Sequence, residues 1–100
     1  MKTTITSIDG RLVDIEIVTA KFHDGNTAVL AKSNGAPYGR ISVNVPDFNL
    51  SQSEIIVKTY SENVWVPQLL ELMPDVFQDT GRRLPWSWPN LQIWRFTPSE

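Results

Sequence analysis

The sequence predicts an α+β fold, a curved antiparallel sheet of about five to seven strands in a meander, packed on one short helix. Two observations support this prediction. Residues 3–60 contain β-branched runs separated by short turns rich in Gly, Asn and Asp, which is typical of antiparallel strands with one face in water. Residues 61–74 instead place apolar side chains at helical spacing. The length of 100 residues predicts a single domain, residues 1–100.

The first two strands are expected to form a hairpin. Residues 3–8 are a β-branched run that ends at Asp9-Gly10, a strong hairpin signal. Residues 12–22 follow, and their apolar positions change phase by one residue after Ile17. Such a change within one strand is what a β-bulge produces. We therefore expect a bulge in the second strand.

Three further runs extend the sheet. Residues 27–32 lie between turns at 24–26 and 34–37, and they are followed by alternating runs at 38–45 and 54–60. The apolar side chains of these strands are expected to face the helix and to form the core with it. The predicted core residues are Val13, Ile15, Ile17, Ile41, Val43, Val45, Ile55 and Val57 on the strands, and Leu69, Leu70 and Met73 on the helix.

The helix is expected between Ser61 and Pro74. Ser61 is a suitable N-cap, and the helical spacing of apolar residues runs from Val66 until Pro74 ends it. A proline is tolerated in the first turn of a helix but not further along it. Pro67 therefore favours a regular helix that starts only at Val66.

A turn at residues 79–81 and a last strand at residues 90–96 complete the chain. Arg95 should face water. The alternation then places Trp94 and Phe96 on the opposite, buried face of the strand.

Composition excludes several classes of function. The net charge of −2 argues against a general binder of nucleic acids or anionic membranes, so direct nucleic-acid binding is not expected. The chain has no cysteine, which excludes a disulfide framework, a thiolate metal site and a cysteine nucleophile. No signal-peptide or membrane-spanning pattern is present, so the expected compartment is the cytoplasm.

No constellation of catalytic residues stands out, and we expect a non-enzymatic protein without metal or cofactor. His23 is the only histidine, and its neighbour Asp24 would point to the opposite face of a strand. One histidine without cysteine makes a poor zinc site. Asp14 and Glu16 share a strand face, but a solvated surface explains this pair without any catalytic role.

Three of the four tryptophans lie in the eleven residues 84–94. Trp86 and Trp88 are two positions apart and are bracketed by prolines, so an extended segment would place both indoles on one side. Tryptophan is also the residue most enriched at binding hot spots. The pair therefore either closes the core of a small domain or forms a recognition surface.

The charges are unevenly distributed near this segment. Residues 61–81 carry four acidic side chains and no lysine or arginine, a local charge of −4, and Arg82 and Arg83 follow directly. A solvated acidic face explains the first feature. Arginine beside tryptophan is also the usual composition of a protein-interface hot spot, and an arginine pair beside aromatic rings could hold a nucleotide.

Five short motifs, taken in order, carry a family resemblance. They are Ala20 followed by Asp24-Gly25-Asn26, Pro37-Tyr38, Ser42-Val43-Asn44-Val45-Pro46, Tyr60-Ser61-Glu62-Asn63, and Asp79-Thr80-Gly81-Arg82. In this order the chain resembles, over residues 10–96, a family of small proteins without established activity that phages, plasmids and conjugative elements of bacteria carry. Accessory proteins of this kind often disarm host defences by binding one component. The resemblance thus implies this context and no chemistry.

The chain departs from this family at two places, and both departures add tryptophan. Trp65-Val66-Pro67 stands where relatives tend to have a glycine-containing helix start, and Trp86-Ser87-Trp88-Pro89 replaces a glycine-rich turn. If Trp65 lies near the other two, the cluster is either extra core or a specialised contact surface. The candidate partner-binding residues are therefore Trp65, Trp86, Trp88, Arg82, Arg83, Glu62, Asp75 and Asp79.

The resulting expectation is a protein of the bacterial host cytoplasm that binds a protein component of a defence complex, as anti-CRISPR proteins do, and blocks it sterically. The alternative is a small-molecule sponge that binds a nucleotide through Arg82 and Arg83. An open sheet edge would also allow a homodimer.

Overall fold

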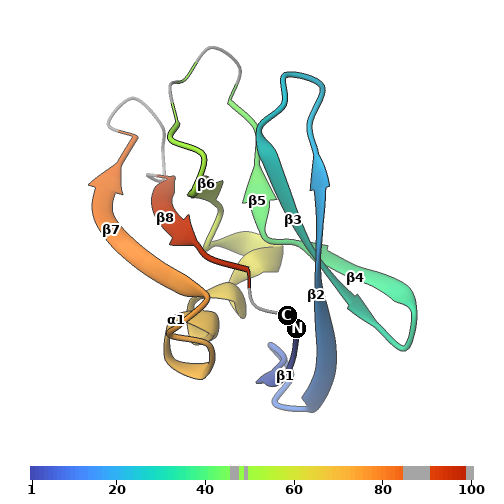
Figure 1. The fold of residues 1–100 in the computed structure, drawn as a ribbon. Helices are drawn as coiled ribbons and strands as arrows, with labels where there is room; N and C mark the ends of the chain where they lie inside the picture. Colours follow the sequence, from blue (N-terminus) through green and yellow to red (C-terminus); the bar gives the residue numbers. More distant parts are fainter. Residues whose placement is uncertain (46–47, 49, 85–90, 99–100) are drawn as a thin grey trace.

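The chain forms two four-stranded antiparallel sheets in the computed structural model, which describes residues 1–45, 48, 50–84 and 91–98 (Figure 1). The first sheet has the order β1-β2-β3-β4 and the second has the order β5-β6-β8-β7. The strands of the first sheet are β1 (Lys2–Thr6), β2 (Leu12–Lys21), β3 (Thr27–Ser33) and β4 (Ala36–Arg40). Those of the second are β5 (Ser42–Val43), β6 (Glu54–Val57), β7 (Phe77–Arg83) and β8 (Gln92–Phe96).

The prediction of one curved sheet is therefore wrong in its topology, although the α+β class and the antiparallel pairing agree with the structure. The expected strand at residues 38–45 is divided at Ile41. The N–H of Ile41 still donates to the carbonyl of Val29 on β3 (2.9 Å), whereas Ser42 and Val43 pair with β6 of the other sheet. One apolar run thus contributes a strand to each sheet. The sequence pattern does not indicate this crossing, because apolar and polar residues alternate with a period of two on both sides of Ile41.

The expected bulge in the second strand is also wrong. β2 pairs with β1 and with β3 without a shift of register. The change of phase has a simpler cause, since Ile15 and Ile17 face the core while Val18 and Ala20 lie on the outer face. A bulge occurs instead where β4 pairs with β3: Ala31 pairs with Gly39, but the next residue, Lys32, pairs with Pro37.

The helical segment consists of two 3₁₀ turns, η1 (Ser61–Asn63) and η2 (Val66–Gln68), followed by the one-turn helix α1 (Leu69–Leu72). Pro67 lies at the start of η2, where a missing N–H costs no hydrogen bond. Ser61 does not act as an N-cap: Tyr60 occupies that position without a side-chain bond, and Ser61 has a φ of 56°. The short helix that was predicted is confirmed, with its regular part limited to one turn.

The main core lies between the two sheets and the helical segment. Most of the predicted core residues are buried there, namely Ile15, Ile17, Ile41, Ile55, Val57 and Leu69, and Val13, Leu70 and Met73 pack against them. Trp94 and Phe96 are buried and Arg95 is exposed, as predicted.

Val43 and Val45 do not join this core. They pack on a second, smaller cluster formed by Ile56, Leu84 and Ile93. Ile56 and Ile93 alternate along β6 and β8 with Ile55 and Trp94 of the main core, so the second sheet is covered on both faces.

Candidate functional site

The expected turn at residues 79–81 is instead an irregularity within β7. Asp79 pairs with Trp94 of β8, but the next paired residue is Arg82, opposite Ile93. Gly81 has a φ of 82°, a conformation that side chains other than glycine's rarely adopt, and its N–H donates to Asp79 Oδ1 (2.9 Å). The strand continues through this bulge, so Arg82 and Arg83 still belong to β7 and follow the bulge.

Both arginines are held by carboxylates of this chain. Arg82 Nη1 lies 2.7 Å from Glu54 Oε2 on β6, so its side chain reaches across β8. Arg83 donates through Nη1 and Nη2 to the two carboxylate oxygens of Asp79, both at 2.9 Å. Such a bidentate pair fixes the orientation of the guanidinium as well as its charge. The side chain of Arg82 is 51% exposed and that of Arg83 is 35% exposed, so both remain reachable from solvent.

The two carboxylates are stabilised in their ionised form. The hydrogen bonds from Arg83 hold the pKa of Asp79 below its usual value, with the Gly81 N–H and the Arg83 charge acting in the same direction against partial burial. Burial by itself would raise the pKa of Glu54, but the bonds from the Ser51 N–H and from Arg82 outweigh it and lower the pKa. Asp79 in turn raises the pKa of Arg83.

This arrangement predicts a specific sensitivity to acid. A carboxyl whose pKa is lower in the folded state contributes stability that is fully present above its unfolded pKa and is lost as the pH falls through the folded pKa. The free energy of unfolding, measured by urea denaturation, should therefore fall from about pH 4 downward.

Asp79→Asn should be less stable than the wild type at pH 7 and should depend less steeply on pH below about pH 4. Asp75→Asn is the matched control, because Asp75 is an exposed aspartate just before β7, at the other end of that strand. An equal acid dependence of Asp79→Asn and the wild type would contradict the role given to the Asp79–Arg83 pair.

Trp86 and Trp88 lie outside the described residues. Leu84 and Leu91 flank segment 85–90. The N–H of Leu84 donates to the carbonyl of Leu91 (3.0 Å), and Leu84 is buried in the second cluster. Leu84 and Leu91, which flank the two tryptophans in the sequence, are therefore paired side by side, and Leu84 directly follows Arg83.

The other candidate residues are not part of this surface. Trp65 is 5% exposed and lies in the main core, where its ring and that of Tyr38 form a T-shaped contact with centroids 5.2 Å apart. A Cβ at Gly39 would lie only 3.1 Å from the same ring, so Trp65 packs directly on the backbone of β4. It is therefore an internal residue and does not belong to an exposed aromatic surface.

Glu62 and Asp75 are also separate from the arginines. Glu62 forms an ion pair with Lys58 (2.8 Å) and lines a hollow beside β4 together with Tyr38 and Arg40. Asp75 lies between α1 and the start of β7, at the other end of β7 from Arg83 (Figure 1). Of the predicted continuous surface, the described residues bring together Asp79, Arg82 and Arg83.

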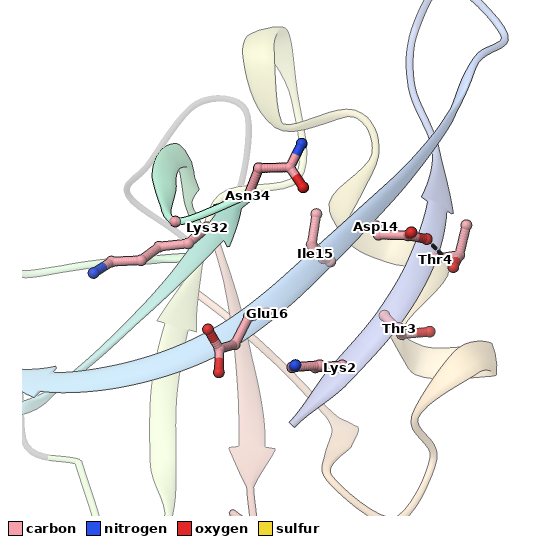
Figure 2. Close-up of a pocket in the computed structure, with 9 residues that line it drawn as sticks. Lys2, Thr3, Thr4, Asp14, Ile15, Glu16, Lys32 and Asn34 are labelled. Carbon is pink, nitrogen blue, oxygen red and sulfur yellow. Dashed lines mark hydrogen bonds between the residues drawn. The ribbon is translucent and has the colours of Figure 1, made fainter.

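A hollow of about 510 Å³ opens on the outer face of the first sheet (Figure 2). Figure 2 shows Glu16 of β2 between Lys2 of β1 and Lys32 of β3, in agreement with the strand register. Beside them the Thr4 hydroxyl donates to Asp14 Oδ1 (2.6 Å). All four charged side chains belong to exposed residues, and their charges alternate, so this face is a solvated strand surface, as predicted for Asp14 and Glu16.

The free sheet edges carry features that hinder pairing with another chain. β5 has two residues, β4 contains Pro37 and a bulge, and β7 contains a bulge and ion-paired charges. On β1, the side-chain amide of Gln68 bonds to both the N–H and the carbonyl of Thr6, at 2.9 and 2.7 Å. A homodimer through an open edge stays a prediction, and these features limit where it could form.

Within the part of the chain that the structure describes, no group of three or more His, Asp or Glu side chains is arranged to hold a metal ion. His23 is exposed in the turn that follows β2. No helix in the same residues has the length and apolar character needed to cross a membrane.

The structure is that of a small α+β protein with two sheets. Its candidate surface lies at the C-terminal end of β7, where Arg82 and Arg83 form ion pairs with Glu54 and Asp79. Comparisons with protein-family models, with curated proteins and with solved structures find no match to this chain. The resemblance to proteins of bacterial mobile elements therefore stays a prediction.

Two exposed residues, Ile8 and Leu12, were not among the predicted candidates, although Asp9-Gly10 marked the turn between them. The two residues are 84% and 76% exposed. The available signal was their position, since Ile8 lies in a tight polar turn and Leu12 begins β2 directly after it, where little core is within reach.

Proposed function

We propose that this chain is a non-catalytic inhibitor of a bacterial defence complex, of the anti-CRISPR type, which binds a protein component and blocks it sterically. The proposal places it in the cytoplasm of the host cell, where such complexes act. The context comes from the sequence resemblance, and the structure supplies the candidate contact surface.

One observation supports this surface above the others. Arg82 and Arg83, already oriented by Glu54 and Asp79, directly precede the Leu84–Leu91 backbone pair, and Trp86 and Trp88 lie between these two leucines in the sequence. Oriented arginines next to tryptophan are the composition that dominates binding energy at protein interfaces. A pre-oriented side chain also loses less conformational entropy on binding.

The same ion pairs weigh against the nucleotide alternative. Phosphate groups on Arg82 and Arg83 would have to displace two carboxylates that lie within 2.9 Å of the guanidinium groups. A rise of the melting temperature with a panel of nucleotides would favour this alternative, because a ligand that binds only the folded state stabilises it.

The decisive experiment is expression of the chain in bacteria that carry CRISPR or restriction systems, followed by phage challenge and co-purification. The proposal expects that phage growth is restored and that a component of the defence complex co-purifies with the chain. Intact defence without any such component would contradict it. A hydrolase or transferase activity abolished by His23→Ala would instead favour an enzyme.

Trp88→Ala tests the contact surface itself. If Trp88 is a hot-spot residue, this change should weaken binding to the co-purified component by at least ~2 kcal/mol and leave stability nearly unchanged. Leu72→Ala is a matched control, since it removes a 45% exposed apolar side chain on α1. A loss of about 3–5 kcal/mol in the free energy of unfolding would instead assign Trp88 to the core.

A further inference from the structure

A hollow of about 390 Å³ opens at the place where the run 38–45 passes from one sheet to the other. β4 ends there at Arg40 in the first sheet, and β5 begins at Ser42 in the second. Residues of β4, β5 and η1 line the hollow together with Lys58, which follows β6. Its volume lies at the lower end of the range for small-molecule sites, about 300–1,000 Å³.

Asn63 of η1 connects the two sides of this hollow. Its side-chain Nδ2 donates to the carbonyl of Arg40 at the end of β4 (2.7 Å) and to the carbonyl of Lys58 (3.1 Å). The residue is only 3% exposed. Both amide hydrogens are therefore used inside the fold, and the two carbonyl acceptors determine which end of the side chain is the nitrogen.

The oxygen of the same amide receives no hydrogen bond from the described residues. All side-chain hydrogen bonds that Asn63 forms in this part of the chain come from Nδ2. An amide oxygen has two lone pairs, and sealing it from water without a donor is costly. No described side-chain oxygen is sealed in this way, so Asn63 Oδ1 opens to the hollow that the residue lines. The hollow thus contains a fixed, free acceptor on a nearly buried residue.

Arg40 supplies a free positive charge to the same hollow. It is exposed, and its side chain forms no ion pair or hydrogen bond with the residues that the structure describes. Lys58 also lines the hollow, but its Nζ lies 2.8 Å from Glu62 Oε1 and 5.1 Å from the ring centroid of Tyr60. The charges of Lys58 and Glu62 offset each other, which leaves the charge of Arg40 for a ligand.

We infer that this hollow binds a small carboxylic acid that carries an N–H or O–H group next to its carboxylate. One carboxylate matches the charge of Arg40, and a guanidinium can hold it through two parallel hydrogen bonds. The neighbouring donor would bond to Asn63 Oδ1. Asn63 contacts the backbone of Arg40 directly, so one small molecule can reach both groups.

N-acylated amino acids have this arrangement of carboxylate and N–H, either as free acids or as the C-terminal residue of a peptide. Val43 and the ring of Tyr38 supply apolar surface of the hollow for the acyl group. Such a site is independent of the proposed function, which uses Arg82 and Arg83.

N-acetylglycine is the probe, and its binding is measured by NMR titration of the isotope-labelled chain. We expect the side-chain amide signals of Asn63 to shift and the melting temperature to rise with the concentration of N-acetylglycine. Two analogues each remove one feature of the probe. N-acetylsarcosine lacks the N–H, and the methyl ester of N-acetylglycine lacks the negative charge, so each should bind more weakly by about tenfold or more.

Arg40→Gln should weaken the binding of N-acetylglycine by about tenfold or more. It should keep the melting temperature of the free chain, because the Arg40 side chain is bonded to no described residue. Arg95→Gln is the matched control, since it changes another exposed arginine, on β8, and should leave binding at the wild-type level. Asn63 itself stays unchanged, because replacing it would remove two hydrogen bonds inside the fold.

N-acetyl-triglycine distinguishes the two sources of the ligand. Tighter binding than that of N-acetylglycine would support a peptide C-terminus, and equal binding would support a free acid. The inference is overturned if N-acetylglycine causes no shift, if N-acetylsarcosine or the methyl ester binds equally well, or if Arg40→Gln binds like the wild type. Tighter binding of inorganic phosphate would also overturn it, because a simple anion site at Arg40 would then suffice.

Discussion

Trp94→Ala is expected to lower the free energy of unfolding by about 3–5 kcal/mol, a larger loss than we expect from truncating any aliphatic residue of the main core. Trp94 has no exposed surface, and its ring packs against Phe77 with centroids 6.0 Å apart. Its indole N–H donates to Gln92 Oε1 (2.9 Å). Alanine would remove the apolar area, leave a cavity between the two sheets and leave the Gln92 amide without this donor.

Urea denaturation followed by circular dichroism measures this change, and an unchanged m-value would show that the unfolded state is not altered. Trp94→Phe is the matched variant. It retains an aromatic ring opposite Phe77 but loses the N–H, so its cost should be clearly smaller. A loss below about 1 kcal/mol for Trp94→Ala would contradict the central place of Trp94 in the core.

Leu69→Ala is expected to have the next largest effect, a loss of about 2–4 kcal/mol. Leu69 is the first residue of α1 and is fully buried in the main core. Its truncation would open a cavity where the helical segment meets both sheets.

Val43→Ala should cost much less, about 1 kcal/mol or below, because Val43 is half-buried in the second cluster and loses fewer contacts. The comparison is informative because the sequence pattern predicted one core for both residues. Equal losses for the two variants would contradict the division into a main core and a second cluster.

The local elements of this protein follow from local sequence. Asp9-Gly10, Asp24-Gly25 and Asn34-Gly35 stand at the three hairpin turns of the first sheet, and Gly10, Gly25, Asn34 and Gly35 have positive φ angles there. These residues tolerate that backbone conformation, so the turn positions can be predicted without any knowledge of the partner strands. The alternation in β8 likewise identified Trp94 and Phe96 as buried.

The candidate site could be predicted only in part. Asp79, Arg82 and Arg83 are close in sequence and are also close in space, because they share β7. Trp65, Glu62 and Asp75 were grouped with them by composition. The fold places these three in the core, beside β4 and at the opposite end of β7, respectively. The partner of Arg82, Glu54, lies 28 positions away in sequence, so no local pattern indicates it.

The sequence alone therefore determined the antiparallel strands other than β7, the short helix and part of the main core, because periodicity and turn chemistry act within a few residues. Only the tertiary structure decided that the run from Tyr38 to Val45 divides between two sheets at Ile41, since the pairing partner of each half comes from a distant strand. It also decided that the second sheet is buried on both faces. A period of two shows which side chains share a face of a strand, but what covers that face depends on segments brought together by the whole fold.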